Sequence, residues 1–176
     1  MVYYGAKELA ASARVVRGNT IRIAEDIPEG KFGYQPAPEC RTVAQMFAHI
    51  ALACRFQYRL HGLERRKSLE GFDFGSMMEQ LLKEEAEPRS KAQILALLRK
   101  EGDAWADWLD TLADAFLAEQ VGMPPGATPA SKSRFEMILS VKEHEMHHRG
   151  QLMLIERLLG IVPHLTVERQ ARMAGR

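Results

Sequence analysis

The chain has 176 residues and a mass of 19.9 kDa, which fits one domain with a substantial core. Lys and Arg number 24 against 23 Asp and Glu, and the resulting formal charge of +1 excludes a generally basic nucleic-acid-binding surface. Two cysteines, Cys40 and Cys54, exclude a disulfide framework and are typical of a reducing compartment. The first residues lack the basic and apolar regions of a secretory signal, and no apolar stretch reaches the roughly 18 residues of a membrane span. We therefore expect a soluble, cytoplasmic, single-domain protein over residues 1–176.

Amphipathic stretches separated by prolines and glycines predict helices in the first third of the chain. The first helix is expected over residues 6–26, and it ends before Pro28 and Gly30. Residues 27–41 contain three prolines and two glycines and predict an extended connection. The second helix is expected to start at Thr42, which forms a capping box with Gln45, and to run to about residue 60.

Two further capping boxes mark the later helices. Ser90 with Gln93 predicts a helix that runs to about residue 119, and Ser133 with Glu136 predicts the last long helix, which ends near Gly160. A loop is expected over 122–131, a short helix over 76–86 and a tail over 164–176, while strand patterns are nearly absent. The predicted fold is therefore all-α, a four-helix bundle with long crossover connections.

Two histidines interrupt the apolar face of the last long helix. His144 and His148 lie where the pattern of this face calls for aliphatic residues; the face comprises Met137, Val141, His144, His148, Leu152, Ile155 and Leu159. Histidines four residues apart lie on one side of a helix and can share a metal ion. His147 points about 100° away from His148, toward a flank of the helix.

A third ligand is expected from the second helix. There His49 lies on the apolar face that also carries Met46, Ala53, Phe56 and Leu60. Three imidazoles from two helices leave coordination positions open for water or substrate, as in catalytic sites. The alternative is that these histidines are hydrogen-bonded core residues without a metal. His61 and His164 are expected to be solvated.

A competing motif occupies the same segment. His144 to His148 matches H-E-x-x-H, the zinc protease pattern in which Glu145 would activate water and Glu168 would be the third ligand. This hypothesis leaves His49 unexplained, and the chain lacks the strands that usually shape a peptide-binding cleft. We therefore rank it below the three-histidine site.

Two segments together resemble a known family. The histidine in the segment MFAHIA, followed 95 positions later by HEMHHRGQ, is similar to the DinB/YfiT family, as is the segment IPEGKFGYQPAPECRT before the second helix. The resemblance extends from the first helix to Gly160. It implies a four-helix bundle that forms a homodimer and binds a divalent metal, nickel or zinc, through His49, His144 and His148.

The resemblance also implies an activity. Characterised members transfer low-molecular-weight thiols such as bacillithiol, mycothiol or glutathione to electrophiles, or isomerise maleylpyruvate with a thiol. We therefore expect a metal-dependent thiol transferase or thiol-dependent isomerase with small-molecule partners and no nucleic acid or membrane partner. The alternative of a different class is a metal-binding stress-response protein without turnover.

The remaining residues of the motif allow several roles. Arg149 is expected to pair with a carboxylate on a neighbouring helix, Gln151 to support packing, and Gly150 to permit the close approach of another helix. Glu145 is open between a general base, a solvated residue and an acceptor for a ligand histidine. No catalytic residue is assigned, and neither Cys40 nor Cys54 has an activating partner in the sequence.

Overall fold

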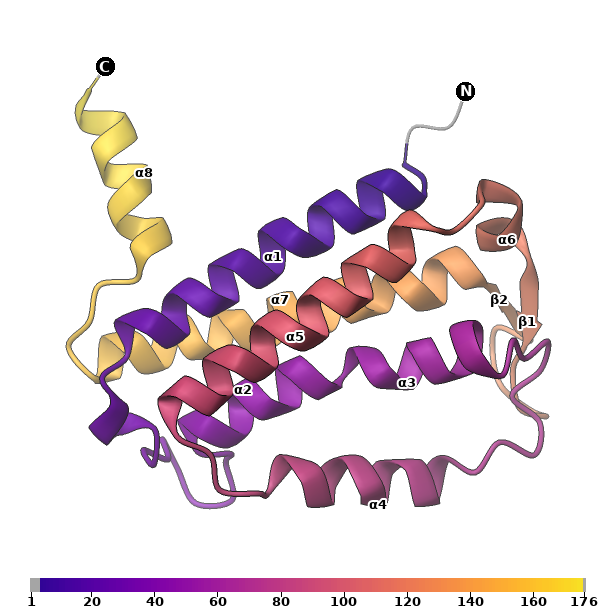
Figure 1. Ribbon diagram of the computed structural model, residues 1–176, viewed down its shortest axis with the longest axis horizontal. Helices are drawn as coiled ribbons and strands as arrows, with labels where there is room; N and C mark the ends of the chain where they lie inside the picture. Colours follow the sequence, from indigo (N-terminus) through magenta and orange to yellow (C-terminus); the bar gives the residue numbers. More distant parts are fainter. Residues whose placement is uncertain (1–3, 176) are drawn as a thin grey trace.

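The computed structural model describes residues 4–175, and residues 1–3 and Arg176 of the expected domain lie outside the described residues. The bundle is formed by four long helical segments, one of which consists of two consecutive helices (Figure 1). They are α1 (Ala6–Asp26), α2 (Val43–Leu52) continued by α3 (Cys54–Tyr58), α5 (Lys91–Asp110) and α7 (Arg134–Leu158). Helix α1 packs on α5 and α7, and α2 packs on α5 and α7 as well. The expected all-α four-helix bundle with long connections is thereby confirmed.

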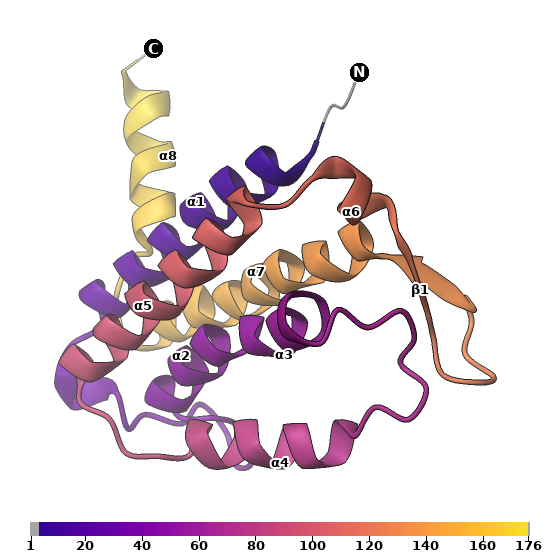
Figure 2. The same ribbon diagram turned by 45° about the vertical axis from the view of Figure 1, so that its right-hand side comes forward.

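Shorter elements occupy the connections. They are a 3-10 turn (Glu29–Lys31), a π-helical turn (Arg59–Leu63), α4 (Phe74–Glu85), α6 (Asp114–Ala118), β1 (Gln120–Gly122), β2 (Ser131–Ser133) and α8 (His164–Ala174). Helix α4 lies alongside α2 and α3 in both views, on the outside of the bundle (Figures 1 and 2). Helix α8 projects away from the bundle, so the segment expected to be a tail is helical through most of its length. In residues 4–175 no helix has the length and apolar character that crossing a bilayer requires.

The three predicted helix starts coincide with observed caps. The hydroxyl oxygens of Thr42, Ser90 and Ser133 accept hydrogen bonds from the backbone N–H groups three residues later. At Thr42 and Ser90 the glutamine side chain also accepts from the cap backbone N–H, which completes the capping box. These local bonds satisfy donors that the first helical turn leaves unpaired.

Two helices end differently from the prediction. The second is interrupted at Ala53 and continues through α3 and the π-helical turn to Leu63, beyond the expected end at residue 60. The third ends at Asp110, and α6 follows after a turn, because Leu109 and Leu117 then both reach the same apolar cluster. Neither break contains a proline, which would have marked a helix end in the sequence. The amphipathic pattern continues through both breaks and does not predict them.

A short hairpin was not predicted. Strands β1 and β2 pair antiparallel, and Val121 at the centre of β1 is fully buried against Leu60 and Met137. Three-residue strands are too short to produce a periodic pattern. Tertiary burial of Val121 therefore decides this structure.

Candidate metal centre

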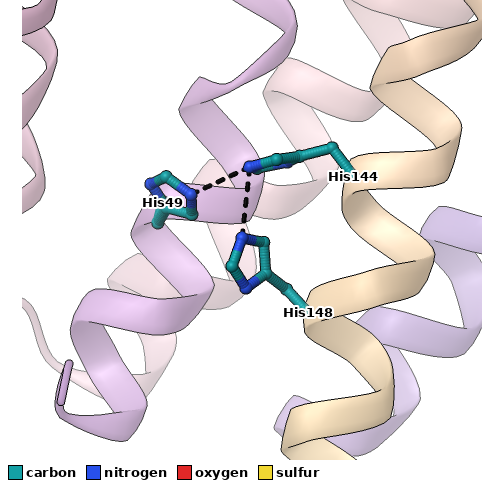
Figure 3. A group of neighbouring side chains, drawn as sticks. All are labelled: His49, His144 and His148. Atoms are coloured by element: carbon teal, nitrogen blue, oxygen red, sulfur yellow. Dashed lines mark hydrogen bonds between the residues drawn. The ribbon is translucent and has the colours of Figure 1, made fainter.

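Three imidazoles from two helices converge at one point. His49 of α2 and His144 and His148 of α7 turn their Nε2 atoms toward one another (Figure 3). The His144 Nε2 atom lies 3.0 Å from His49 Nε2 and 3.1 Å from His148 Nε2. The structure thus brings together all three residues that the apolar faces single out.

These separations fit coordination of one ion. Two nitrogens bound at about 2.0–2.1 Å lie roughly 2.9–3.4 Å apart for angles between octahedral and tetrahedral values. Both measured separations fall in this interval. All three ligand atoms lie within 4.8 Å of one another, so the three side chains are close enough to share a divalent metal.

A carboxylate orients His49. The His49 Nδ1–H donates to Glu85 Oε2 at 2.8 Å, and Arg41 Nε donates to the other oxygen of Glu85. Burial raises the pKa of Glu85, but the bonds from His49 and Arg41 outweigh it and hold the pKa below its ordinary value. Since the carboxylate is ionised, the proton of His49 resides on Nδ1, and the Nε2 lone pair faces the centre.

An amide orients His148. Its Nδ1–H donates to Gln151 Oε1 at 2.7 Å, so the Nε2 lone pair also faces the centre. Gln151 in turn donates to Nε2 of the exposed His147, which lies outside the cluster as its helix position indicates. Gln151 therefore fixes the ring of His148, a role beyond the packing expected of it.

His144 is the neutral centre of the group. Burial, followed by the charges of His148 and His49, lowers the pKa of His144 to about 4. Its buried Nδ1 has no hydrogen-bond partner among residues 4–175. Its Nε2 faces two lone pairs at once and can donate to only one of them. A bound cation would accept the lone pairs of all three Nε2 atoms, so the residues present fit a metal.

Glu145 faces the opposite side of α7. Its Oε1 accepts from Arg17 Nε at 2.9 Å and from the Thr20 hydroxyl at 2.7 Å, and its Oε2 accepts from Arg17 Nη2 at 3.0 Å. Both charged side chains are 7% exposed. The pair is closely packed against α5. A Cβ added at Gly102 of α5 would lie only 2.6 Å from Arg17 Cγ, so no larger side chain fits there. Glu145 cannot activate water at the histidines from this position.

The zinc protease hypothesis therefore fails on both of its additional residues. Glu145 is paired inside the bundle, and Glu168 is an exposed residue of α8, the helix that projects away from the bundle. His49 occupies the position of the third ligand.

A cavity adjoins the cluster. It has a volume of about 200 Å³ and lies between α2, α3, α4 and α7. Its wall is mostly apolar, and it contains His49, Leu52, Ala53, Phe56, Gln57, Met78, Leu81, Leu82, Glu85, Ser140, Val141 and His144. Such a cavity can hold a small organic molecule next to the histidines.

Several other expectations are corrected. His61, expected to be solvated, is 1% exposed, because it lies in the π-helical turn beneath Arg134. His164 is also largely buried, next to Asn19 of α1. A Cβ on Gly150 would meet nothing within 4 Å, so this glycine allows no close helix approach. Arg149 has no carboxylate within ion-pair distance in residues 4–175.

The cysteines lie outside the centre. Cys54 is buried, and burial raises the pKa of its thiol to about 11, which disfavours the nucleophilic thiolate. Cys40 is exposed in the connection before α2.

A model of the DinB superfamily matches residues 13–152. The chain belongs to the DinB superfamily. No curated protein is significantly similar to it in sequence.

Solved structures share the fold at low identity. YfiT of Bacillus subtilis, described as a probable metal-dependent hydrolase with an unusual four-helix bundle topology, is 16% identical with a TM-score of 0.69, covering 92% of this chain and 91% of its own. A DinB-like protein of Bacillus cereus is 18% identical with a TM-score of 0.69, covering 92% and 97%. A DinB-like protein of Bacillus subtilis is 16% identical with a TM-score of 0.63, covering 87% and 92%.

The sequence did not reveal the residues that support the centre. Glu85 lies at the end of α4, and Arg41 lies in the connection before α2; neither belongs to a motif with His49. Their roles depend on where α4 lies against α2. Of the supporting residues, only Gln151 could have been predicted from the sequence. It follows His148 by three residues and therefore lies on the same side of the helix.

Proposed function

We propose that this DinB protein is a divalent-metal-dependent enzyme that transfers a low-molecular-weight thiol to an electrophile. His49, His144 and His148 are its proposed ligands. The observation that carries the proposal is the convergence of three Nε2 atoms, two of them with their Nδ1 protons held outward, beside an apolar cavity.

The chain's own residues supply orientation and exclusion of water. Glu85 and Gln151 hold two rings in the tautomer that presents a lone pair. The apolar wall of the cavity contains Phe56, Leu81 and Val141 and keeps a bound electrophile out of bulk water. His49, His144 and His148 would hold the cation, which would supply open positions where a bound thiol has a lowered pKa and is therefore a nucleophilic thiolate at neutral pH.

Hydrolysis is the second candidate, because the similar YfiT structure is described as a probable metal-dependent hydrolase. Hydrolysis benefits from a general base that removes a proton from water. The two carboxylates nearest the motif are both engaged, Glu145 with Arg17 and Glu85 with Arg41 and His49. This engagement favours thiol transfer, in which the nucleophile needs no separate base once it is ionised.

The test measures thiol alkylation. Protein reconstituted with nickel or zinc is mixed with glutathione, bacillithiol or mycothiol and with monobromobimane, which becomes fluorescent when sulfur displaces bromide. We expect the wild-type protein to accelerate the reaction with at least one thiol, and His148→Ala to lose at least about 100-fold of this rate. His147→Ala is the matched control, since it removes the adjacent, exposed imidazole.

The other outcomes separate the alternatives. Equal rates in His148→Ala and wild type would overturn the role of the centre. Cleavage of p-nitrophenyl acetate without any thiol, lost in His148→Ala, would support the hydrolase. Bound metal with neither activity would support the metal-binding stress-response protein without turnover.

A further inference from the structure

One polar side chain of the cavity has an unused donor. Gln57 of α3 is 8% exposed and lines the cavity together with His49 and His144. Its Oε1 is engaged by His61 at 3.0 Å, but its amide nitrogen has no hydrogen-bond partner within residues 4–175. Because the side chain as a whole is largely buried and lines the cavity, this free donor is available to a molecule inside the cavity.

The orientation of this amide follows from its neighbours. Arg134 is 1% exposed and donates from Nη1 to Nδ1 of His61 at 2.9 Å. Because a guanidinium has no acceptor, His61 Nδ1 must offer its lone pair. Burial and the charge of Arg134 lower the pKa of His61 to about 4, so the ring is neutral at pH 7 and its proton resides on Nε2.

The His61 Nε2–H therefore donates to Gln57, and Gln57 must present its oxygen to His61. The proton on His61 Nε2 thus fixes which end of the Gln57 amide is oxygen. Glu119 holds Arg134 in turn, through Oε2 and Nε at 2.9 Å. A chain of fixed hydrogen bonds thus leaves the amide NH2 of Gln57 for a ligand.

The other polar groups of the cavity are already satisfied or belong to the metal centre. The Ser140 hydroxyl donates to the Met137 carbonyl at 2.6 Å, and both oxygens of Glu85 accept from His49 and Arg41. No lysine or arginine lines the cavity among the described residues. Away from the metal centre, the wall therefore offers no cation to a carboxylate or phosphate.

We infer that the cavity binds an uncharged, mainly apolar compound whose carbonyl oxygen accepts a hydrogen bond from the Gln57 amide. The inference rests on the proposed function for the role of this compound, which would be the electrophile. Gln57 is then a residue that determines specificity, and Arg134 and His61 are positioning residues that fix its amide. Away from the metal centre the wall offers no counterion, so the part of the compound that lies against Gln57 is uncharged.

The test compares ligands that differ in one group. Binding of acetophenone and ethylbenzene to metal-loaded protein is followed by NMR titration. We expect acetophenone to bind wild-type protein more tightly than ethylbenzene by about three- to tenfold, the contribution of one hydrogen bond. In Gln57→Met this preference for acetophenone should disappear while the affinity for ethylbenzene is retained.

A second variant protects the test against misfolding. Gln57→Met leaves the His61 donor without an acceptor, whereas Gln57→Glu keeps an oxygen for His61 and replaces the donating NH2 with a second, accepting oxygen of a carboxylate. It should lose the preference for acetophenone as well. Gln80→Met makes the same change at an exposed glutamine of α4 that lines a separate cavity next to Cys54 and Trp105, and it should leave all affinities unchanged.

The opposite results would overturn the inference. They are an acetophenone preference that survives both Gln57 variants, no binding by the wild-type protein, or sensitivity to Gln80→Met in place of Gln57→Met. Because binding is measured without a thiol, thiol transfer can fail while this inference holds. Equally, this inference can fail while thiol transfer is observed.

Discussion

At the scale of single residues, the chemistry of the centre depends on what holds the outward nitrogen of each histidine. His49 has a carboxylate partner, His148 an amide partner and His144 none among the described residues. A carboxylate makes an imidazole a stronger ligand than an amide does. We therefore expect His49 to contribute most strongly to the affinity for a metal.

The first prediction concerns the carboxylate beneath His49. Glu85→Gln keeps an oxygen that can accept from His49 Nδ1–H, but it removes the negative charge and leaves Arg41 without its partner. We expect the Kd for zinc or nickel to rise about 10- to 100-fold, measured by competition with a chromophoric chelator.

Glu84→Gln is the control for this change. Glu84 precedes Glu85 on α4 and pairs with Arg55, away from the histidines. The Kd of Glu84→Gln for zinc or nickel should match that of the wild-type protein. An unchanged Kd in Glu85→Gln would show that the carboxylate merely packs beside the ring.

At the scale of elements, α7 presents two chemically different sides. His144 and His148 face α2, whereas Glu145 binds Arg17 and Thr20 of α1. The Arg17 guanidinium also donates to the Leu98 carbonyl of α5 at 2.8 Å. The ion pair therefore joins three helices and supports the position of the helix that carries two of the histidines.

The second prediction separates this structural role from catalysis. Glu145→Gln leaves the Arg17 charge without its counterion inside the bundle, and we expect the free energy of unfolding to fall by about 3 kcal/mol in urea denaturation. The number of metal ions bound per chain should not change, since neither Glu145 nor Arg17 contacts the three imidazoles.

Glu143→Gln provides the comparison on the same helix. Glu143 is exposed, so its change should cost less than about 0.5 kcal/mol. If Glu145→Gln instead abolished activity at unchanged stability, Glu145 would act at the metal, as the zinc protease hypothesis requires.

The starts of the helices were more predictable than their ends. Thr42, Ser90 and Ser133 act through bonds to residues three positions away, so a local sequence pattern contains the whole interaction. The break at Ala53 and the end of α5 at Asp110 depend on contacts with distant residues. A local pattern cannot contain these contacts.

At the scale of the whole molecule, the centre joins helices that are far apart in the sequence. His49 and His144 are separated by 95 positions, yet each was predictable because a histidine on an apolar helix face is conspicuous. The cavity was not predictable, because its outer wall is α4, whose position follows a connection without a strong pattern. The Gln57–His61–Arg134 chain was hidden for the same reason, since Arg134 lies 73 residues from His61.

The most direct test of the central claim is the metal content of the purified protein. Wild type, His49→Ala and His147→Ala are prepared without chelator or affinity-tag metal, reconstituted with nickel or zinc, and measured by mass spectrometry. The account predicts one equivalent in the wild-type protein and in His147→Ala, and none in His49→Ala. A full equivalent in His49→Ala, or no metal in the wild-type protein after reconstitution, would contradict it and reduce the three histidines to residues of the core.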